Sequence, residues 1–268
     1  MNERELQRIL DFAVDAAHQA GTFTLGHFQS GIGHELKADN TPVTLADRGA
    51  ERLLRERIAA AYPDHGIVGE EFGEQRGRSP ARWILDPIDG TVSFLSGVPL
   101  YSVLIGFEWN GEMLAGVLHL PALKETVYAA RGLGCRWNGR PARVSDVTEL
   151  SQARLVLTSV KLMYKHGRGA EYERLRDACG LDRGWSDAYG YALLATGRAE
   201  LLVDPIMSLW DTAALVPIVT EAGGTVTDWT GRPTHTAPEI LATNGHLLPA
   251  ALDVLRGERD KCQVKGER

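Results

Sequence analysis

The sequence predicts an α+β protein built as a layered sandwich, and two observations support this fold class. Two long segments with helical periodicity come first and are followed by a series of short β-like runs, whereas helices and strands alternate after about residue 150. A chain of 268 residues can form one large domain or two closely packed subdomains. We place the boundary near residues 140–150, with an N-terminal subdomain over 1–145 and a C-terminal subdomain over 146–268.

The first half is predicted to contain two helices and a meander of strands. Apolar residues recur at helical spacing over 3–28 and 45–62, and Pro63 ends the second run. Asn110-Gly111 and Asn138-Gly139 are typical of hairpin turns. The β-like runs are 67–69, 82–86, 101–109, 112–120 and 125–130.

The second half is predicted to alternate between the two kinds of element. We expect strands at 154–159, 199–204, 224–229 and 239–243, and helices at 171–179, 188–197 and 212–221. Pro217 lies inside the last of these helices, so we expect a kink there.

Composition narrows the class of protein. No apolar run approaches the roughly 20 residues of a membrane span, and the charged N-terminal segment does not resemble a signal peptide, so we expect a cytoplasmic protein with no membrane association. The 3 cysteines lie far apart without CxxC spacing, which argues against a disulfide framework and a zinc site. The net charge of -6 and the scattered basic residues argue against a nucleic-acid partner.

The segment WILDPIDGTVSF, residues 83–94, ends a hydrophobic run on Asp86 and Asp89. Pro87 cannot donate to a strand ladder, so we expect the strand to end there with both carboxylates on one side. A divalent cation would offset their repulsion, and Mg²⁺ prefers such oxygen ligands. A turn in which the aspartates cap nearby amides fits the spacing equally well.

Gly90 and Thr91 follow directly and begin a short helical pattern. Free amides at such a start bind phosphate, and glycine permits close approach, although Asp-Gly is also a common turn. The acidic protein would repel an anionic substrate, so phosphate binding would need a local positive element such as a bound metal.

Further acids lie next to predicted element ends. Glu70 follows the strand at 67–69, and we expect Glu71 to be solvated. Asp211 and Asp47 each lie at the start of a predicted helix, where a carboxylate can equally serve as an N-cap. The pattern alone therefore does not predict that these acids converge.

Four motifs in order resemble the inositol monophosphatase family of Mg²⁺-dependent phosphatases. They are GEE at 69–71, DPIDGT at 86–91, WDTAA at 210–214 and EAGG at 221–224. The resemblance covers about 41–224 and implies a layered αβαβα sandwich that usually forms a homodimer. It also implies two or three Mg²⁺ ions in each active site.

The resemblance assigns roles to individual residues. Asp47 and Thr91 would orient the attacking water, and Glu70 would contribute to catalysis as a metal ligand. Gly90 and Thr91 would bind the phosphate group. The implied metal ligands are Glu70, Asp86, Asp89 and Asp211, together with the backbone carbonyl of Ile88.

The stretch 185–224 closely resembles the histidinol-phosphate phosphatase branch of the family. That branch places a substrate acid at Asp187, and inositol phosphatases carry one at the position of Asp204. Asp187 also fits a helix N-cap. Val92 stands where the branch is expected to have arginine or lysine, and Leu209 replaces a more usual proline.

The combined hypothesis is a Mg²⁺-dependent phosphomonoesterase that hydrolyses L-histidinol phosphate, a small-molecule phosphate ester, in histidine biosynthesis. The alternatives are an inositol-1-monophosphatase or a broad sugar-phosphate phosphatase. A non-enzymatic RNA- or polymerase-associated role is a further alternative, because a bacterial member of the family serves as such a partner.

Overall fold

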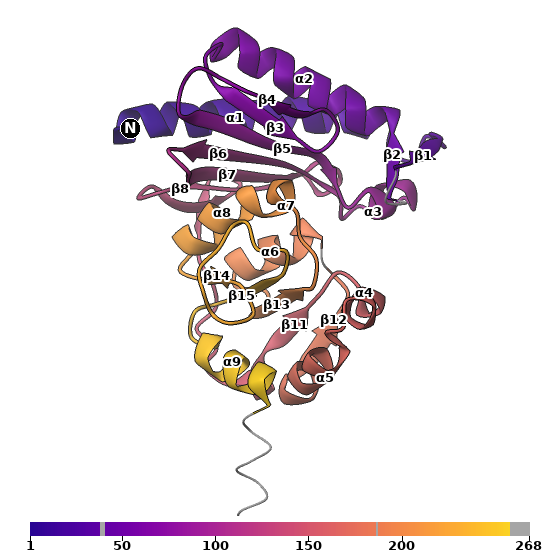
Figure 1. Cartoon of the computed structure of the whole chain (residues 1–268), viewed down its shortest axis with the longest axis vertical. Helices are drawn as coiled ribbons and strands as arrows, with labels where there is room; N and C mark the ends of the chain where they lie inside the picture. The colour runs from indigo at the N-terminus through magenta and orange to yellow at the C-terminus, as the bar shows by residue number, and fades with distance from the viewer. Residues whose placement is uncertain (38–40, 186, 258–268) are drawn as a thin grey trace, which may run out of the picture.

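The computed structural model describes residues 1–37, 41–185 and 187–257. Two helices, α1 (Glu3–Leu25) and α2 (Leu45–Ala61), cover one face of a large sheet. A second layer of helices separates this sheet from a smaller one, whose outer face is covered by further helices (Figure 1). This order of layers is the αβαβα sandwich that the motifs implied.

The larger sheet confirms the predicted meander. Within the described residues it has 8 strands in the order β10-β9-β8-β7-β6-β5-β3-β4, and the pairs from β5 to β10 are all antiparallel. Its strands are β3 (Gly66–Gly69), β4 (Gly73–Gln75), β5 (Ala81–Asp89), β6 (Ser102–Trp109), β7 (Glu112–Leu120), β8 (Glu125–Ala130), β9 (Gly134–Trp137) and β10 (Arg140–Ala142).

Strand β5 does not end at Pro87, and the prediction for this point was wrong. The strand continues to Asp89 through a register shift, because Asp86 pairs with Leu104 whereas Asp89 pairs with Ser102. The shift inserts one extra residue around the proline, which has no N–H to donate. Residues three apart point to opposite faces of a regular strand, so this bulge turns the two carboxylates to the same side.

The smaller sheet is mixed, and the described part has 5 strands in the order β12-β11-β13-β15-β14. They are β11 (Arg154–Val156), β12 (Leu181–Arg183), β13 (Leu201–Asp204), β14 (Thr225–Thr227) and β15 (Ile240–Thr243). Helices α6 (Ala188–Ala195), α7 (Leu209–Ala213) and α8 (Leu215–Glu221) lie between the two sheets. The outer face carries α4 (Val160–Lys165), α5 (Gly169–Ala178) and α9 (Leu248–Arg256), of which α4 and α9 were not predicted.

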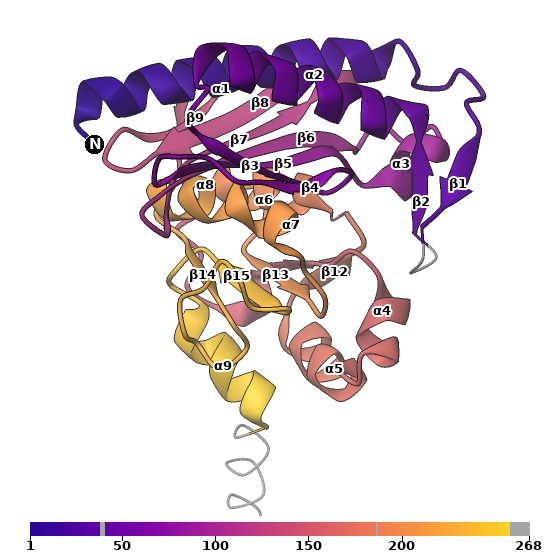
Figure 2. The same ribbon diagram turned by 45° about the horizontal axis from the view of Figure 1, so that its top comes forward.

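Two further short elements lie at one end of the molecule. The strands β1 (His34–Leu36) and β2 (Pro42–Thr44) pair antiparallel, and β2 contacts α3 (Thr91–Leu95) (Figure 2). Strands of three residues carry too little periodicity to be recognised in the sequence. None of the helices in the described ranges is both long and apolar enough to cross a membrane.

The predicted helix over 212–221 is interrupted near Pro217, where we expected a kink. The chain forms α7 and α8 with a break at Ala214. A proline ring clashes with the carbonyl four residues earlier, so the helix is interrupted about one turn before Pro217. The break separates the short helix that carries Asp211 from the longer helix behind it.

Two glycines let this broken helix approach the large sheet closely. A Cβ atom at Gly106 of β6 would lie 2.7 Å from the Cβ of Ala213. A Cβ atom at Gly116 of β7 would lie 2.0 Å from the carbonyl oxygen of Ala214. No side chain fits in either place, so the backbones of α7 and α8 rest directly on β6 and β7.

A buried histidine fixes α1 against the same sheet. His119 of β7 is 8% exposed, and its Nδ1 lies 2.9 Å from Oγ1 of Thr126. Nε2 of His18 on α1 lies 2.9 Å from the same hydroxyl. Burial, followed by the nearby charge of His18, lowers the pKa of His119 to about 4.

Gly116→Ala is expected to destabilise the protein by about 3 kcal/mol, because the added methyl group meets a backbone carbonyl that cannot move independently. Urea unfolding followed by circular dichroism measures this loss. Gly33→Ala is the matched control, since a Cβ there has no heavy atom within 4 Å. Equal unfolding midpoints for the two variants would contradict the close approach of α8 to β7.

Acidification is expected to destabilise the protein through His119. The unfolded chain binds the proton near pH 6.5, whereas the folded protein binds it only near pH 4, so stability is lost as the pH falls between these values. Between pH 7.5 and pH 5 this amounts to about 2 kcal/mol. The free energy of unfolding of His119→Asn, which cannot titrate, should fall by correspondingly less over the same interval. Identical pH dependence in both proteins would show that His119 titrates normally.

Candidate active site

Three predicted metal ligands converge in the structure. Oxygen atoms of Asp86, Asp89 and Asp211 all lie within 4.8 Å of one another. The first two come from the bulged end of β5, and the third comes from α7, which packs against β5 and β6. More than 100 residues of sequence separate Asp211 from the pair, so only the packing of α7 brings them together.

The cluster is strongly coupled by charge. Burial, followed by the charge of Glu70, raises the pKa of Asp86 well above its usual value. Burial and the charge of Asp187 do the same to Asp89. Burial raises the pKa of Asp211 to about 7, and the charge of Glu70 adds to it. A cation among these carboxylates would favour their ionised forms at neutral pH.

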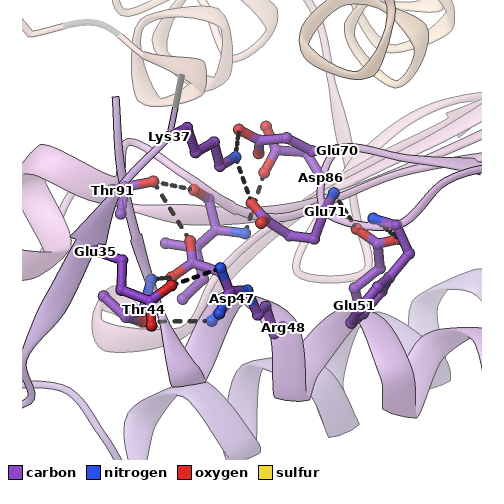
Figure 3. Close-up of polar contacts among 12 residues, drawn as sticks. Glu35, Lys37, Thr44, Asp47, Arg48, Glu51, Glu70, Glu71, Asp86 and Thr91 are labelled. Atoms are coloured by element: carbon purple, nitrogen blue, oxygen red, sulfur yellow. Dashed lines mark hydrogen bonds and ion pairs between the residues drawn. The ribbon is translucent and has the colours of Figure 1, made fainter. Parts of the chain in front are cut away.

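Glu70 lies beside this cluster, where the parallel pairing of β3 and β5 places it. Its side chain is in hydrogen-bonding contact with Asp86. Nζ of Lys37 also contacts Glu70 at 2.7 Å and Glu71 at 2.6 Å (Figure 3). Burial opposes the charge of Lys37, but the two hydrogen bonds outweigh burial and raise its pKa.

The expectation of a solvated Glu71 was wrong. Its side chain is 3% exposed, and burial raises its pKa to about 7 although the hydrogen bond from Lys37 opposes this shift. Lys37 follows strand β1, whose three residues are all exposed, and it lies more than 30 residues before the motif in sequence, so no local pattern predicts this contact. The ion pair therefore depends on how the β1–β2 hairpin packs.

Glu51 of α2 holds the turn that carries Glu70, and the sequence analysis missed it. Its side chain is fully buried, and its two carboxylate oxygens accept the backbone N–H groups of Glu71 at 2.7 Å and Phe72 at 3.2 Å (Figure 3). Arg55, one turn along the helix, donates to Glu51 at 2.7 Å. A glutamate on the apolar face of α2 was the available signal, because such a residue needs buried partners.

The two carboxylate oxygens of Asp47 accept hydrogen bonds from different residues. Its Oδ2 accepts the backbone N–H of Thr44 at 2.8 Å, and Thr44 is the N-cap of α2. Its Oδ1 accepts a hydrogen bond from Oγ1 of Thr91 at 3.4 Å (Figure 3). Burial raises the pKa of Asp47, although the hydrogen bonds from Thr44 oppose the shift. Asp47 is thus the N3 residue of a capping box rather than the N-cap, and it also contacts Thr91 as the resemblance implied.

Gly90 and Thr91 form the turn between β5 and α3. Gly90 is the N-cap of α3 with φ 79° and ψ 45°, a left-handed conformation that favours glycine. A Cβ there would also lie 2.9 Å from Oδ2 of Asp187. The carbonyl of Ile88, a predicted metal ligand, accepts a hydrogen bond from Oγ1 of Thr91 at 3.2 Å.

Asp187 lies at the N-cap position of α6, but its side chain does not cap the helix. It accepts instead from Oγ of Ser93 at 3.4 Å, next to the Gly90 turn. Its backbone has φ 54° and ψ -161°, which is disfavoured for any residue with a Cβ and costs on the order of 1–3 kcal/mol. Burial, followed by the charge of Asp204, raises the pKa of Asp187 to about 6.

A cavity of about 110 Å³ opens beside the acidic cluster. Its polar wall includes Asp89, Asp187, Asp204 and Asp211, and its apolar wall includes Leu162, Ile206 and Met207. Asp204 is 2% exposed and accepts from Oγ1 of Thr158 at 2.7 Å and from the hydroxyl of Tyr191 at 3.0 Å. The predicted site residues are thus linked by contacts that run from Asp47 at the start of α2, through the end of β5, to Asp204 on β13.

The donor set fits a hard divalent cation. Carboxylate oxygens are the ligands that Mg²⁺ prefers, and a metal among the buried Asp86 and the half-buried Asp89 and Asp211 would offset their mutual repulsion. Asp86, Asp89 and Asp211 form the cluster that could hold an ion, and Glu70 lies within reach of Asp86. Phosphate esters are anionic, so such an ion would make this acidic surface receptive to them.

Comparison with known proteins agrees with this geometry. The family model described as the inositol monophosphatase family matches residues 5–259. The chain is 46% identical over 257 residues to a histidinol-phosphatase of Chlorobaculum parvum, covering 94% of this chain and 98% of the relative. It is 33% identical to an inositol-1-monophosphatase of Rhizobium meliloti, covering 92% of this chain and 96% of the relative.

A solved structure has the same fold. The extragenic suppressor protein suhB from Bartonella henselae superposes with a TM-score of 0.87 at 30% identity, covering 92% of this chain and 98% of that chain. The family match over residues 5–259 includes both sheets and the three aspartates of the acidic cluster. On the sequence match, the fold and the converging carboxylates, the chain belongs to the inositol monophosphatase family of phosphatases.

Proposed function

We propose that this phosphatase hydrolyses L-histidinol phosphate to L-histidinol and phosphate, with Mg²⁺ held by Glu70, Asp86, Asp89 and Asp211 and by the carbonyl of Ile88. The similarity to a histidinol-phosphatase at 46% identity supports the substrate. The observation that carries the proposal is the position of Asp187. Its carboxylate lies in the cavity beside the acidic cluster and against Gly90.

The phosphate group and the ammonium group of the substrate need different partners in the site. The phosphate would lie at the Gly90-Thr91 turn, where the first backbone N–H groups of α3 have no acceptor within the helix. The carboxylate of Asp187 takes the space that a side chain at Gly90 would need. Histidinol phosphate carries an ammonium group a few bonds from its phosphate. Asp187 is placed to accept a charge-assisted hydrogen bond from that group, whereas a neutral polyol offers only hydroxyls.

The protein's own groups can also orient the attacking water. The hydroxyl of Thr91 has a single proton, which lies between two acceptors, Oδ1 of Asp47 at 3.4 Å and the carbonyl of Ile88 at 3.2 Å. With either acceptor, the lone pairs of Oγ1 are free to accept a hydrogen bond from water. Burial of Asp47 and its two contacts from Thr44 keep this carboxylate in one position. When bound, Mg²⁺ supplies charge neutralisation for the phosphate ester and activation of the nucleophile.

Removing one carboxylate of the cluster is expected to abolish turnover without unfolding the protein. Asp86→Asn and Asp211→Asn should each lower kcat/KM with Mg²⁺ by at least about 100-fold, since a lost ligand weakens transition-state charge stabilisation by several kcal/mol. The melting temperature without metal should stay equal or rise, because the substitution relieves repulsion between buried carboxylates. Phosphate release and thermal unfolding measure the two effects.

Asp177→Asn serves as the control, because the side chain of Asp177 is 70% exposed and far from the cluster in sequence. Full activity of the wild-type protein after chelation of divalent cations would rule out the metal site. Retained activity of Asp211→Asn would show that α7 does not contribute to the site.

Substrate choice is expected to depend on Asp187. Asp187→Asn should lower kcat/KM for histidinol phosphate by about 10- to 100-fold, because a charge-assisted hydrogen bond contributes roughly 1.5–3 kcal/mol. The same variant should lose much less on inositol-1-phosphate, since that substrate has no cation. Steady-state kinetics on both esters decide the matter. A wild-type preference for inositol-1-phosphate would favour the polyol phosphatase alternative.

A further inference from the structure

Asp204 lines the cavity but uses both carboxylate oxygens within the protein. Oδ1 accepts the hydroxyl of Thr158 at 2.7 Å and the backbone N–H of the same residue at 3.3 Å. Oδ2 accepts the hydroxyl of Tyr191 at 3.0 Å. Asp204 is 2% exposed, and these three hydrogen bonds orient its carboxylate.

The hydroxyl of Thr158 connects Asp204 to Asp187. Its single proton is donated to Asp204, so its lone pairs are available as acceptors. The backbone N–H of Asp187 lies 3.3 Å from this oxygen and donates to it. Asp204, Thr158 and the backbone of Asp187 thus form one continuous chain of hydrogen bonds.

The backbone of Asp187 is held from the other side by the acidic cluster. The N–H of Ala188, the next residue, donates to Oδ2 of Asp89 at 2.7 Å. Asp187 itself has the unfavourable φ of 54°, a conformation that persists only where neighbouring contacts enforce it. Asp89 of β5, in the large sheet, accepts the hydrogen bond on one side. Thr158, two residues after β11 of the small sheet, accepts the one on the other side.

We propose that Asp204 and Thr158 are positioning residues that set substrate selectivity through Asp187, and that Asp204 does not contact the substrate. This inference rests on the proposed function, because it takes Asp187 as the carboxylate that recognises a cationic phosphate ester. The hydrogen bonds hold Asp187 in its strained backbone conformation, with its carboxylate against Gly90. Without the hydroxyl of Thr158, the backbone relaxes and the carboxylate leaves that position.

Substitutions at Thr158 test the connection. Thr158→Val removes the hydroxyl at nearly constant volume, and should lower kcat/KM for histidinol phosphate at least 10-fold more than kcat/KM for p-nitrophenyl phosphate, chiefly through KM. Thr158→Ser keeps the hydroxyl and should restore most of the selectivity. Thr225→Val is the matched control, because its hydroxyl bonds to Thr243 at 2.8 Å in β14 and β15, and it should behave as wild type.

Asp204→Asn separates positioning from direct binding. Asparagine keeps an oxygen for the hydroxyl of Thr158, so the variant should retain kcat/KM for histidinol phosphate within about threefold. A loss as large as that of Asp187→Asn would show that Asp204 binds the substrate cation itself and would overturn the inference. An equal loss on both esters in Thr158→Val, without rescue by serine, would also overturn it.

A double-mutant cycle makes the result independent of the substrate assignment. On whichever ester the wild type prefers, Asp187→Asn combined with Thr158→Val should be no worse than Asp187→Asn alone, because both changes act at the same carboxylate. Additive losses contradict the inference. A wild-type preference for a neutral polyol ester contradicts the proposed function, while the cycle still reports whether the two residues act together.

Discussion

The active site depends on the direct contact between the broken helix α7–α8 and the strands β6 and β7. Because Gly106 and Gly116 have no side chains, the backbone of the broken helix lies in direct contact with these two strands. This packing carries Asp211 to the end of β5, where it meets Asp86 and Asp89. A single methyl group at either glycine would move α7 away, and the three carboxylates would no longer share one small volume.

Concentrating buried carboxylates is unfavourable, and the surrounding structure offsets part of this with backbone donors. Asp47 and Asp211 each accept the N–H of a residue three positions earlier, at Thr44 and Ser208, where their helices begin. The capping and functional interpretations of these acids are therefore compatible, because one oxygen serves the helix and the other faces the site. Glu51 acts similarly on the turn after β3, although it lies outside the cluster.

Sequence patterns predicted features that lie within one helix or strand. They failed for features that depend on contacts with another part of the chain. The strand after Trp83 was recognised, but its continuation past Pro87 was not, because a bulge depends on the register of β6. Glu71 was expected to be solvated, yet its side chain is buried and forms an ion pair with Lys37. Lys37 follows a three-residue strand, which is too short to be predicted from sequence periodicity. Thr158 and Tyr191 gave no signal, since their importance comes only from Asp204.

The sequence by itself determined the two long helices, the antiparallel meander and the motifs that place acids at element ends, because each follows from local periodicity or from residue chemistry within a few positions. The tertiary structure decided that Asp86, Asp89 and Asp211 converge, that Asp187 faces Gly90 and that Asp204 is enclosed. These contacts join residues up to 125 positions apart along the chain (211 minus 86). Only the packing of helices between the two sheets fixes such distances, and no local pattern encodes them.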